Sequence, residues 1–162
     1  MKEPVWVMRE VVLAAHEELL ARYGGLSGLR DEGLWDSALH RPPQLFAYGQ
    51  PDLFQLGAAY AAGIVKKHPF LDGNKRSGFI TAYIFLEANG EEFAAPEEEV
   101  FLQTLALAAG EITERVYADW LKASCKRPRL ARPRRDADPK SRNAPMPNRH
   151  KDIEDSSRTM SR

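Results

Sequence analysis

The sequence has one cysteine, no long apolar run and no pattern of a cleavable leader. Cys125 alone cannot form a disulfide within the chain, which is typical of proteins of a reducing cytoplasm. No stretch reaches the roughly 20 consecutive apolar residues that cross a bilayer. The first residues lack the basic-then-apolar order of a signal peptide. We therefore expect a soluble, cytoplasmic protein that makes no contact with a membrane.

Aromatic residues are missing from the last part of the chain. All 3 Trp, 5 Tyr and 7 Phe precede position 126. Residues 126–162 carry 12 Lys/Arg against 5 Asp/Glu and 5 of the 11 prolines, whereas residues 1–125 carry 18 acidic and 11 basic residues. Such a segment cannot bury enough apolar surface to offset its ordering entropy. The sequence predicts a domain at 1–125 and a basic, Pro/Arg-rich disordered tail at 126–162, which could contact nucleic acid non-specifically.

Strand patterns are scarce, and apolar residues recur mostly at helical intervals. The spacing and the capping residues predict a mainly α domain, a compact bundle of about six helices. The expected helices run over residues 9–23, 31–40, 52–67, 74–89, 97–109 and 113–124. Pro42-Pro43 is expected to end the second of them. The strand candidates are 4–7 and 92–94, as one short pair.

Residues 68–76 read His-Pro-Phe-Leu-Asp-Gly-Asn-Lys-Arg and are the most informative part of the chain. Pro69 disfavours continuation of the preceding helix, and Gly73 permits a backbone shape that other residues resist. The nine residues therefore predict a helix end, a tight loop and a new helix that begins near Asn74. The N–H groups and the partial positive charge of a helix N-terminus favour phosphate.

The side chains of this window suit phosphate chemistry at a nucleotide. Lys75 and Arg76 place two cations at the new helix N-terminus. A carboxylate such as Asp72 can hold Mg²⁺ against phosphates, and His68 titrates near neutrality, so it can deprotonate a hydroxyl. A Walker A loop is excluded, because that motif needs G-x-x-x-x-G-K-[ST] between a strand and a helix.

The window resembles the motif H-P-F-x-[DE]-G-N-G-R of the Fic/Doc superfamily, and specifically its death-on-curing (Doc) toxins. In the Doc form lysine replaces the second motif glycine, and that position is Lys75 here. The preceding glycine position is Gly73, as in Fic proteins, where the Doc prototype has alanine. The resemblance covers roughly residues 5–124 and includes similar segments at 22–26, 28–31, 52–54 and 109–112.

The resemblance implies that the site binds ATP and Mg²⁺ and assigns a role to seven residues. His68 would take the proton of the target hydroxyl, and Asp72 would bind Mg²⁺. The other five would shape the loop or bind nucleotide phosphates: Phe70 as the structural anchor, Gly73 and Asn74 as the anion-binding turn, and Lys75 and Arg76 as catalytic phosphate contacts.

The resemblance also implies an activity. In Fic enzymes the second glycine admits the α- and β-phosphates and AMP is transferred, whereas Doc-like proteins bind the nucleotide reversed and transfer the γ-phosphoryl group. Lys75 therefore favours a protein kinase toxin, whose known family target is a threonine of elongation factor Tu. Because Gly73 matches the Fic form of the motif, a Fic-type protein adenylyltransferase is the alternative activity. A non-enzymatic binding module is the third hypothesis.

Many Fic proteins carry an inhibitory helix, [ST]-x-x-x-E-[GN], in the same chain. No Ser or Thr of this sequence is followed four residues later by Glu. If the protein is a toxin of a type II toxin–antitoxin system, its restraint is expected from a separate antitoxin acting in trans.

Simpler interpretations of individual residues stay open at this stage. Asp72 could only cap the helix that begins near Asn74, and the two adjacent cations could be a solvated face. His16 is interpreted as a surface or packing residue. Arg30 and Arg41 are candidates for lining the pocket, with a structural or solvated role as the preferred interpretation.

Overall fold

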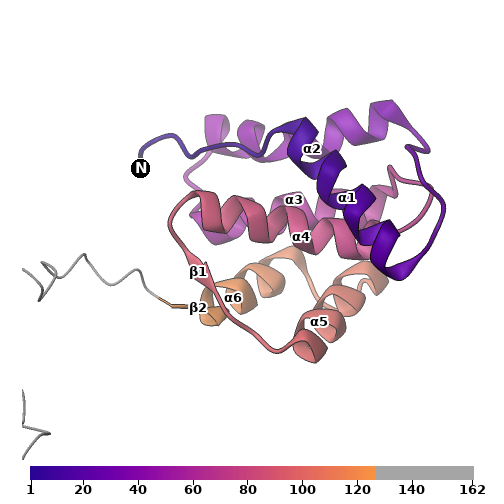
Figure 1. The fold of residues 1–162 in the computed structure, drawn as a ribbon. Coiled ribbons are helices and arrows are strands. Elements are labelled where there is room, and N and C mark those ends of the chain that lie inside the picture. Colours follow the sequence, from indigo (N-terminus) through magenta and orange to yellow (C-terminus); the bar gives the residue numbers. More distant parts are fainter. Residues whose placement is uncertain (127–162) are drawn as a thin grey trace, which may run out of the picture. The chain divides into compact units, whose positions relative to one another are not determined.

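Six helices and one two-stranded pair make up residues 1–126, the part of the chain that the computed structural model describes (Figure 1). This confirms the prediction of a mainly α bundle. The expected tail at 126–162 lies outside the described residues except for Lys126, and the boundary at 125 stays a prediction. The elements are α1 (Arg9–Tyr23), α2 (Glu32–Tyr48), α3 (Leu53–Lys67), α4 (Asn74–Ala88), β1 (Glu92–Phe93), α5 (Glu97–Ala109), α6 (Glu114–Ser124) and β2 (Cys125–Lys126).

Helices α3 and α4 form the centre of this part of the chain, with α1 and α2 on one side and α5 and α6 on the other (Figure 1). Every residue of α3 from Leu56 to Val65 is buried. Small residues allow the two central helices to approach closely: a Cβ on Gly78 of α4 would lie 2.6 Å from Cγ1 of Val65 and 3.1 Å from the carbonyl oxygen of Ala61. The core therefore fixes the two helices that flank the 68–73 loop.

Side-chain caps start three of the helices where the sequence predicted them. The Asp31 carboxylate accepts from the backbone N–H of Leu34 at 3.0 Å, and Thr113 Oγ1 accepts from that of Val116 at 3.1 Å. Asp52 and Gln55 form a capping box at the start of α3. These local bonds explain why the starts of the helices could be read from the sequence.

The expectation that Pro42-Pro43 ends the second helix is wrong, because α2 continues to Tyr48. Each proline removes an intrahelical hydrogen bond and costs about 3 kcal/mol in a helix interior. Tertiary packing offsets this cost: Pro42 is buried, and the centroids of the Phe46 and Trp6 rings lie 5.7 Å apart. Arg41, one residue before the prolines, pairs with Glu114 on α6. The burial of this face of α2 outweighs the local preference.

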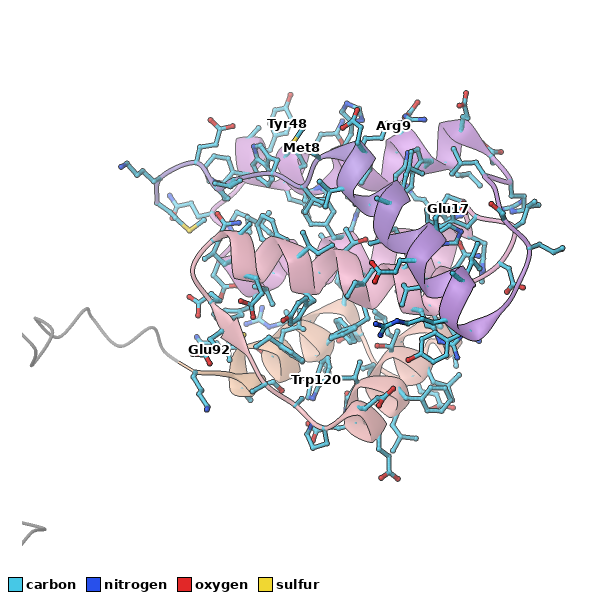
Figure 2. The ribbon with its side chains drawn as sticks, viewed as in Figure 1. Met8, Arg9, Glu17, Tyr48, Glu92 and Trp120 are labelled. Carbon is cyan, nitrogen blue, oxygen red and sulfur yellow. The ribbon has the colours of Figure 1, made fainter. Side chains whose placement is uncertain are left out.

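The expected pairing of 4–7 with 92–94 is also wrong. β1 pairs antiparallel with β2, so that Phe93 lies opposite Cys125. The N-terminal segment is instead held by the amide of Asn89, which accepts from Val5 N at 2.8 Å and donates to Val5 O at 3.0 Å. An aromatic contact supports the strand pair, since the rings of Phe93 and Trp120 lie 5.6 Å apart. Figure 2 labels Glu92 of β1 and Trp120 of α6.

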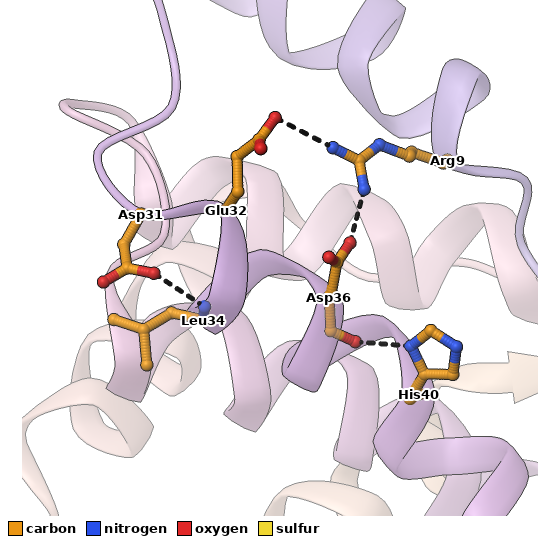
Figure 3. A network of polar contacts seen from close by, with 6 residues as sticks. All are labelled: Arg9, Asp31, Glu32, Leu34, Asp36 and His40. Carbon is orange, nitrogen blue, oxygen red and sulfur yellow. Dashed lines mark hydrogen bonds and ion pairs between the residues drawn. The ribbon is translucent and has the colours of Figure 1, made fainter.

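A cation joins the first turn of α1 to α2. The Arg9 guanidinium pairs with Asp36 and lies 3.6 Å from Glu32 (Figure 3). Both carboxylates are more than half exposed, so the two pairs together contribute about 1 kcal/mol or less. None of the helices within residues 1–126 is long and apolar enough to cross a membrane.

Candidate functional site

The window at 68–76 forms the loop between the two central helices, residues 68–73, and the first residues of α4, as the sequence predicted. α3 ends at Lys67, and α4 begins at Asn74. The Asn74 side chain closes the loop, because its Oδ1 accepts from Phe70 N at 2.9 Å and its Nδ2 donates to Phe70 O at 3.0 Å. Asn74 is 8% exposed, so this pair of bonds is shielded from water. The Asn74 amide fixes the shape of the loop, and its expected part in binding an anion stays a prediction.

Phe70 anchors the loop in the core. Its side chain is 1% exposed and belongs to a cluster with Val12 and Ile64. The ring stacks on the imidazole of His16 with 3.7 Å between centroids, and the ring of Trp35 lies 4.9 Å away. Any movement of the loop away from the core would expose this aromatic contact.

Gly73 gives α4 an open N-terminus. Its φ of 75° lies in the left-handed region, and a Cβ here would lie 3.4 Å from His16 Cε1. As the N-cap of α4 it supplies no side-chain hydrogen bond. The first N–H groups of a helix have no intrahelical partner, so those of α4 remain available to an anion. Glycine therefore satisfies the backbone and leaves the N-terminus of α4 uncovered.

Asp72 lies directly before this N-terminus and is exposed. Its Oδ1 accepts from Gly73 N at 2.9 Å, and its Oδ2 accepts from Leu26 N at 3.4 Å. The carboxylate thus bonds outside α4 instead of capping it, and lone pairs on both oxygens remain free for a cation.

The oxygen ligand at this position, the Asp72 carboxylate, fits Mg²⁺. Residues 1–126 contain no group of three or more His, Cys, Asp or Glu arranged to hold a metal ion. Mg²⁺ bound together with a nucleotide takes one or two carboxylates and completes its shell with phosphates and water. A single carboxylate next to an open helix N-terminus meets that requirement, and Asp72 is the residue that would hold the ion.

Lys75 and Arg76 are both exposed on the first turn of α4. The Arg76 guanidinium lies 4.1 Å from the centroid of the Tyr23 ring, so a cation–π contact holds it at the end of α1. A cavity of about 730 Å³ opens beside the two cations, with Tyr83, Phe93 and other apolar side chains in its wall. His68 and Asp72 do not line it. The cations therefore stand between the loop and an apolar cavity.

His68 is the C-cap of α3, and its backbone adopts a left-handed conformation with φ 51° and ψ 57°. It is the only non-glycine residue with positive φ in residues 1–126. The residue is exposed, and no hydrogen bond to its imidazole is found within these residues. The ring is thus accessible to a substrate. The structure places the seven expected site residues on one loop and the first turn of one helix.

Sequence reasoning left open whether His16 is a surface or a packing residue, and the structure shows that it packs beneath the loop. The residue is 1% exposed, and its Nδ1 lies 2.7 Å from the hydroxyl of Ser77 in the first turn of α4. Its Nε2 finds no partner within the described residues. The signal was present in the sequence, since Val12 lies four residues earlier and both belong to the buried face of α1. Arg41, by contrast, forms an ion pair with Glu114 of α6 and does not belong to the site.

His16 should make the stability of the domain depend on pH. Burial lowers the pKa of His16 below its ordinary 6.5, while Glu17 and Asp72 raise it to a lesser extent. Because the unfolded chain binds the proton more readily, the free energy of unfolding should fall as pH drops through about 6.5.

Urea titrations at pH 7.5 and pH 5.5 measure this effect. The His16→Phe variant keeps an aromatic ring against Phe70 and cannot titrate, so its free energy of unfolding should change less between the two pH values. An equal change in both proteins would show that other groups carry the pH dependence.

Comparison with known proteins identifies relatives of this site. The model of the Fic/DOC family matches residues 6–86, which include the whole loop and nearly all of α4. The chain is similar to the protein named Protein kinase doc of Escherichia phage P1, with 36% identity over 115 residues, 70% of this chain and 90% of the phage protein. It is also similar to the Toxin Doc of Mycolicibacterium smegmatis, with 39% identity over 90 residues, 54% of this chain and 66% of that toxin.

Proposed function

This chain belongs to the Fic/DOC family, and from that premise we propose that it is a Doc-like toxin: a protein kinase that transfers the γ-phosphoryl group of ATP to a serine or threonine hydroxyl of another protein. One observation carries the proposal. An accessible histidine and a carboxylate lie on a fixed loop that leads into an uncapped helix N-terminus with two cations. Phosphoryl transfer needs mainly positioning and charge stabilisation, and this arrangement can supply both.

His68 acts as the general base in this mechanism. Its imidazole takes the proton of the target hydroxyl as the hydroxyl oxygen bonds to the γ-phosphorus. The bond from that phosphorus to the β–γ bridging oxygen breaks, and ADP leaves with the electron pair. Lys75, Arg76 and the N–H groups of α4 bind the phosphate oxygens, whose negative charge they offset.

Asp72 would hold Mg²⁺ in this site. When bound, the ion neutralises charge on the phosphates of the nucleotide. The hydrogen bonds from Gly73 N and Leu26 N orient the carboxylate, so its direction is set before any ligand binds.

The proposed partners follow from the same premise. The relative from Mycolicibacterium smegmatis is named a toxin, which supports a cognate antitoxin that restrains this chain in trans. An elongation factor Tu-like protein is the first target to test. A translation factor as the target would place the reaction in the cytoplasm.

Protein adenylylation is the alternative reaction, and Gly73 is the residue that favours it, because the same glycine occurs in the Fic form of the motif. Lys75 argues against it. Its side chain stands at the position where Fic enzymes have a glycine, and a four-carbon chain with an ammonium group would crowd phosphates bound in that orientation.

Labelled ATP separates the two reactions. We expect the purified chain to label an elongation factor Tu-like substrate from γ-³²P-ATP and not from α-³²P-ATP, with Mg²⁺ present, and addition of EDTA should stop labelling. The His68→Ala variant is the matched control and should give no label.

Label from α-³²P-ATP alone would establish the adenylyltransferase instead. Growth arrest on expression, with no label from either nucleotide and no effect of His68→Ala, would support the non-enzymatic binding module.

A further inference from the structure

The backbone of His68 is held in a conformation that this residue does not favour by itself. A left-handed backbone costs a residue with a Cβ roughly 1–2 kcal/mol. Such a conformation persists only where the surroundings over-determine it. His68 has φ 51° and ψ 57°, and Pro69 follows directly. The neighbours of this peptide therefore decide where the imidazole is presented.

Part of the constraint comes from a strand-like pairing with the segment before α2. The carbonyl of Pro69 accepts from the backbone N–H groups of Arg30 at 2.7 Å and Asp31 at 3.2 Å. Leu71 N donates to Gly28 O at 3.1 Å. These bonds fix the loop after His68, but none of them reaches the carbonyls of His68 or Lys67.

The side chain of Arg30 binds those two carbonyls. Its Nε donates to His68 O at 2.7 Å, and its Nη2 donates to Lys67 O at 2.9 Å. The last carbonyls of a helix lack intrahelical donors and carry partial negative charge, which favours a cation at this end. The rigid fork of a guanidinium can satisfy two neighbouring oxygens at once, whereas an ammonium is a single compact charge.

We propose that Arg30 is a positioning residue for the reaction: it fixes the left-handed backbone of His68 through the carbonyls of residues 67 and 68 and so sets where the imidazole is presented. The inference rests on the proposed function, in which His68 is the base. Arg30 acts on the peptide and not on the loop's phosphate-binding end, so its loss should affect the chemical step more than ATP binding.

Kinetics of Arg30→Ala and Arg30→Lys against the unmodified chain test this inference. We expect the kcat of γ-phosphoryl transfer to fall by about 10–100-fold in Arg30→Ala, the effect of a small misplacement of a catalytic group. The KM for ATP should stay within about twofold. Arg30→Lys should recover part of the loss, since one ammonium can serve one of the two carbonyls. Arg115→Ala, which removes an exposed arginine on α6, is the matched control and should keep full activity.

Two further measurements separate positioning from a loss of folded protein. Urea titration gives the folded fraction under assay conditions, by which kcat is corrected. The one-bond Cα–Hα coupling of His68, which is sensitive to the sign of φ, should report loss of the left-handed backbone in Arg30→Ala.

The outcomes keep this inference apart from the proposed function. If the unmodified chain transfers phosphate and Arg30→Ala retains both its corrected kcat and the positive-φ coupling, Arg30 does not position His68. If the unmodified chain transfers no phosphate, the proposed function fails first, and a retained positive-φ coupling in Arg30→Ala would still show that Arg30 does not hold the backbone.

Discussion

Replacement of His68 by alanine should lower the rate of phosphoryl transfer by about 10²–10⁴-fold, which is the usual contribution of a positioned general base. The fold should survive, because the imidazole is exposed and no hydrogen bond to it is found within the described residues. Incorporation of γ-³²P into the target measures the rate, and growth on induction of the variant gives the effect in cells.

Two other substitutions make the result specific to the imidazole. His68→Asn should behave like His68→Ala, and asparagine tolerates the left-handed backbone, so a change of backbone cannot explain the loss. His40→Ala removes another exposed histidine, whose Nδ1 lies 2.8 Å from the Asp36 carbonyl on α2, and should keep full activity (Figure 3). Transfer at the normal rate by both His68 variants would remove this residue from the mechanism.

Replacement of Phe70 by alanine should lower the free energy of unfolding by about 3–5 kcal/mol, as for other buried aromatic residues. The ring is 1% exposed and lies against both His16 and Trp35, so its removal leaves a cavity between α1, α2 and the loop. A loss of this size is a large part of the 5–15 kcal/mol that stabilises a typical domain. Urea titration monitored by circular dichroism measures it.

The neighbouring residue provides the control. Leu71 is 50% exposed, and Leu71→Ala should change the free energy of unfolding by about 0.5 kcal/mol or less. Similar losses in the two variants would mean that the loop as a whole, and not the aromatic anchor, carries the stability.

Local chemistry made most of the helix boundaries readable from the sequence. Asp31, Asp52 and Thr113 accept hydrogen bonds from backbone three residues later, and such caps depend only on neighbours in the chain. The loop at 68–73 was predictable for the same reason, because Pro69 restricts its own backbone and that of the residue before it, whereas Gly73 permits the left-handed turn before α4.

Contacts between distant segments could not be read in this way. α2 continues past Pro42 and Pro43 because Pro42 is buried and Phe46 packs against another part of the chain. β1 pairs with β2, whose residues follow only after two further helices. From the sequence, Arg30 was a candidate for lining the pocket, with a structural or solvated role as the preferred interpretation. The guanidinium of Arg30 reaches the end of α3 because residues 28–31 pair with residues 69–71, and this pairing joins segments far apart in the chain.

The close contact of α3 and α4 has a consequence for the entropy of catalysis. Gly78 lets the two helices approach until Val65 leaves no room for a Cβ, and the loop from His68 to Gly73 is joined to both of them. The ends of the loop thus lose their conformational freedom when the domain folds and not when a substrate binds. A nucleotide that binds at α4 need not order this backbone, so more of its binding free energy remains for orienting the reacting groups.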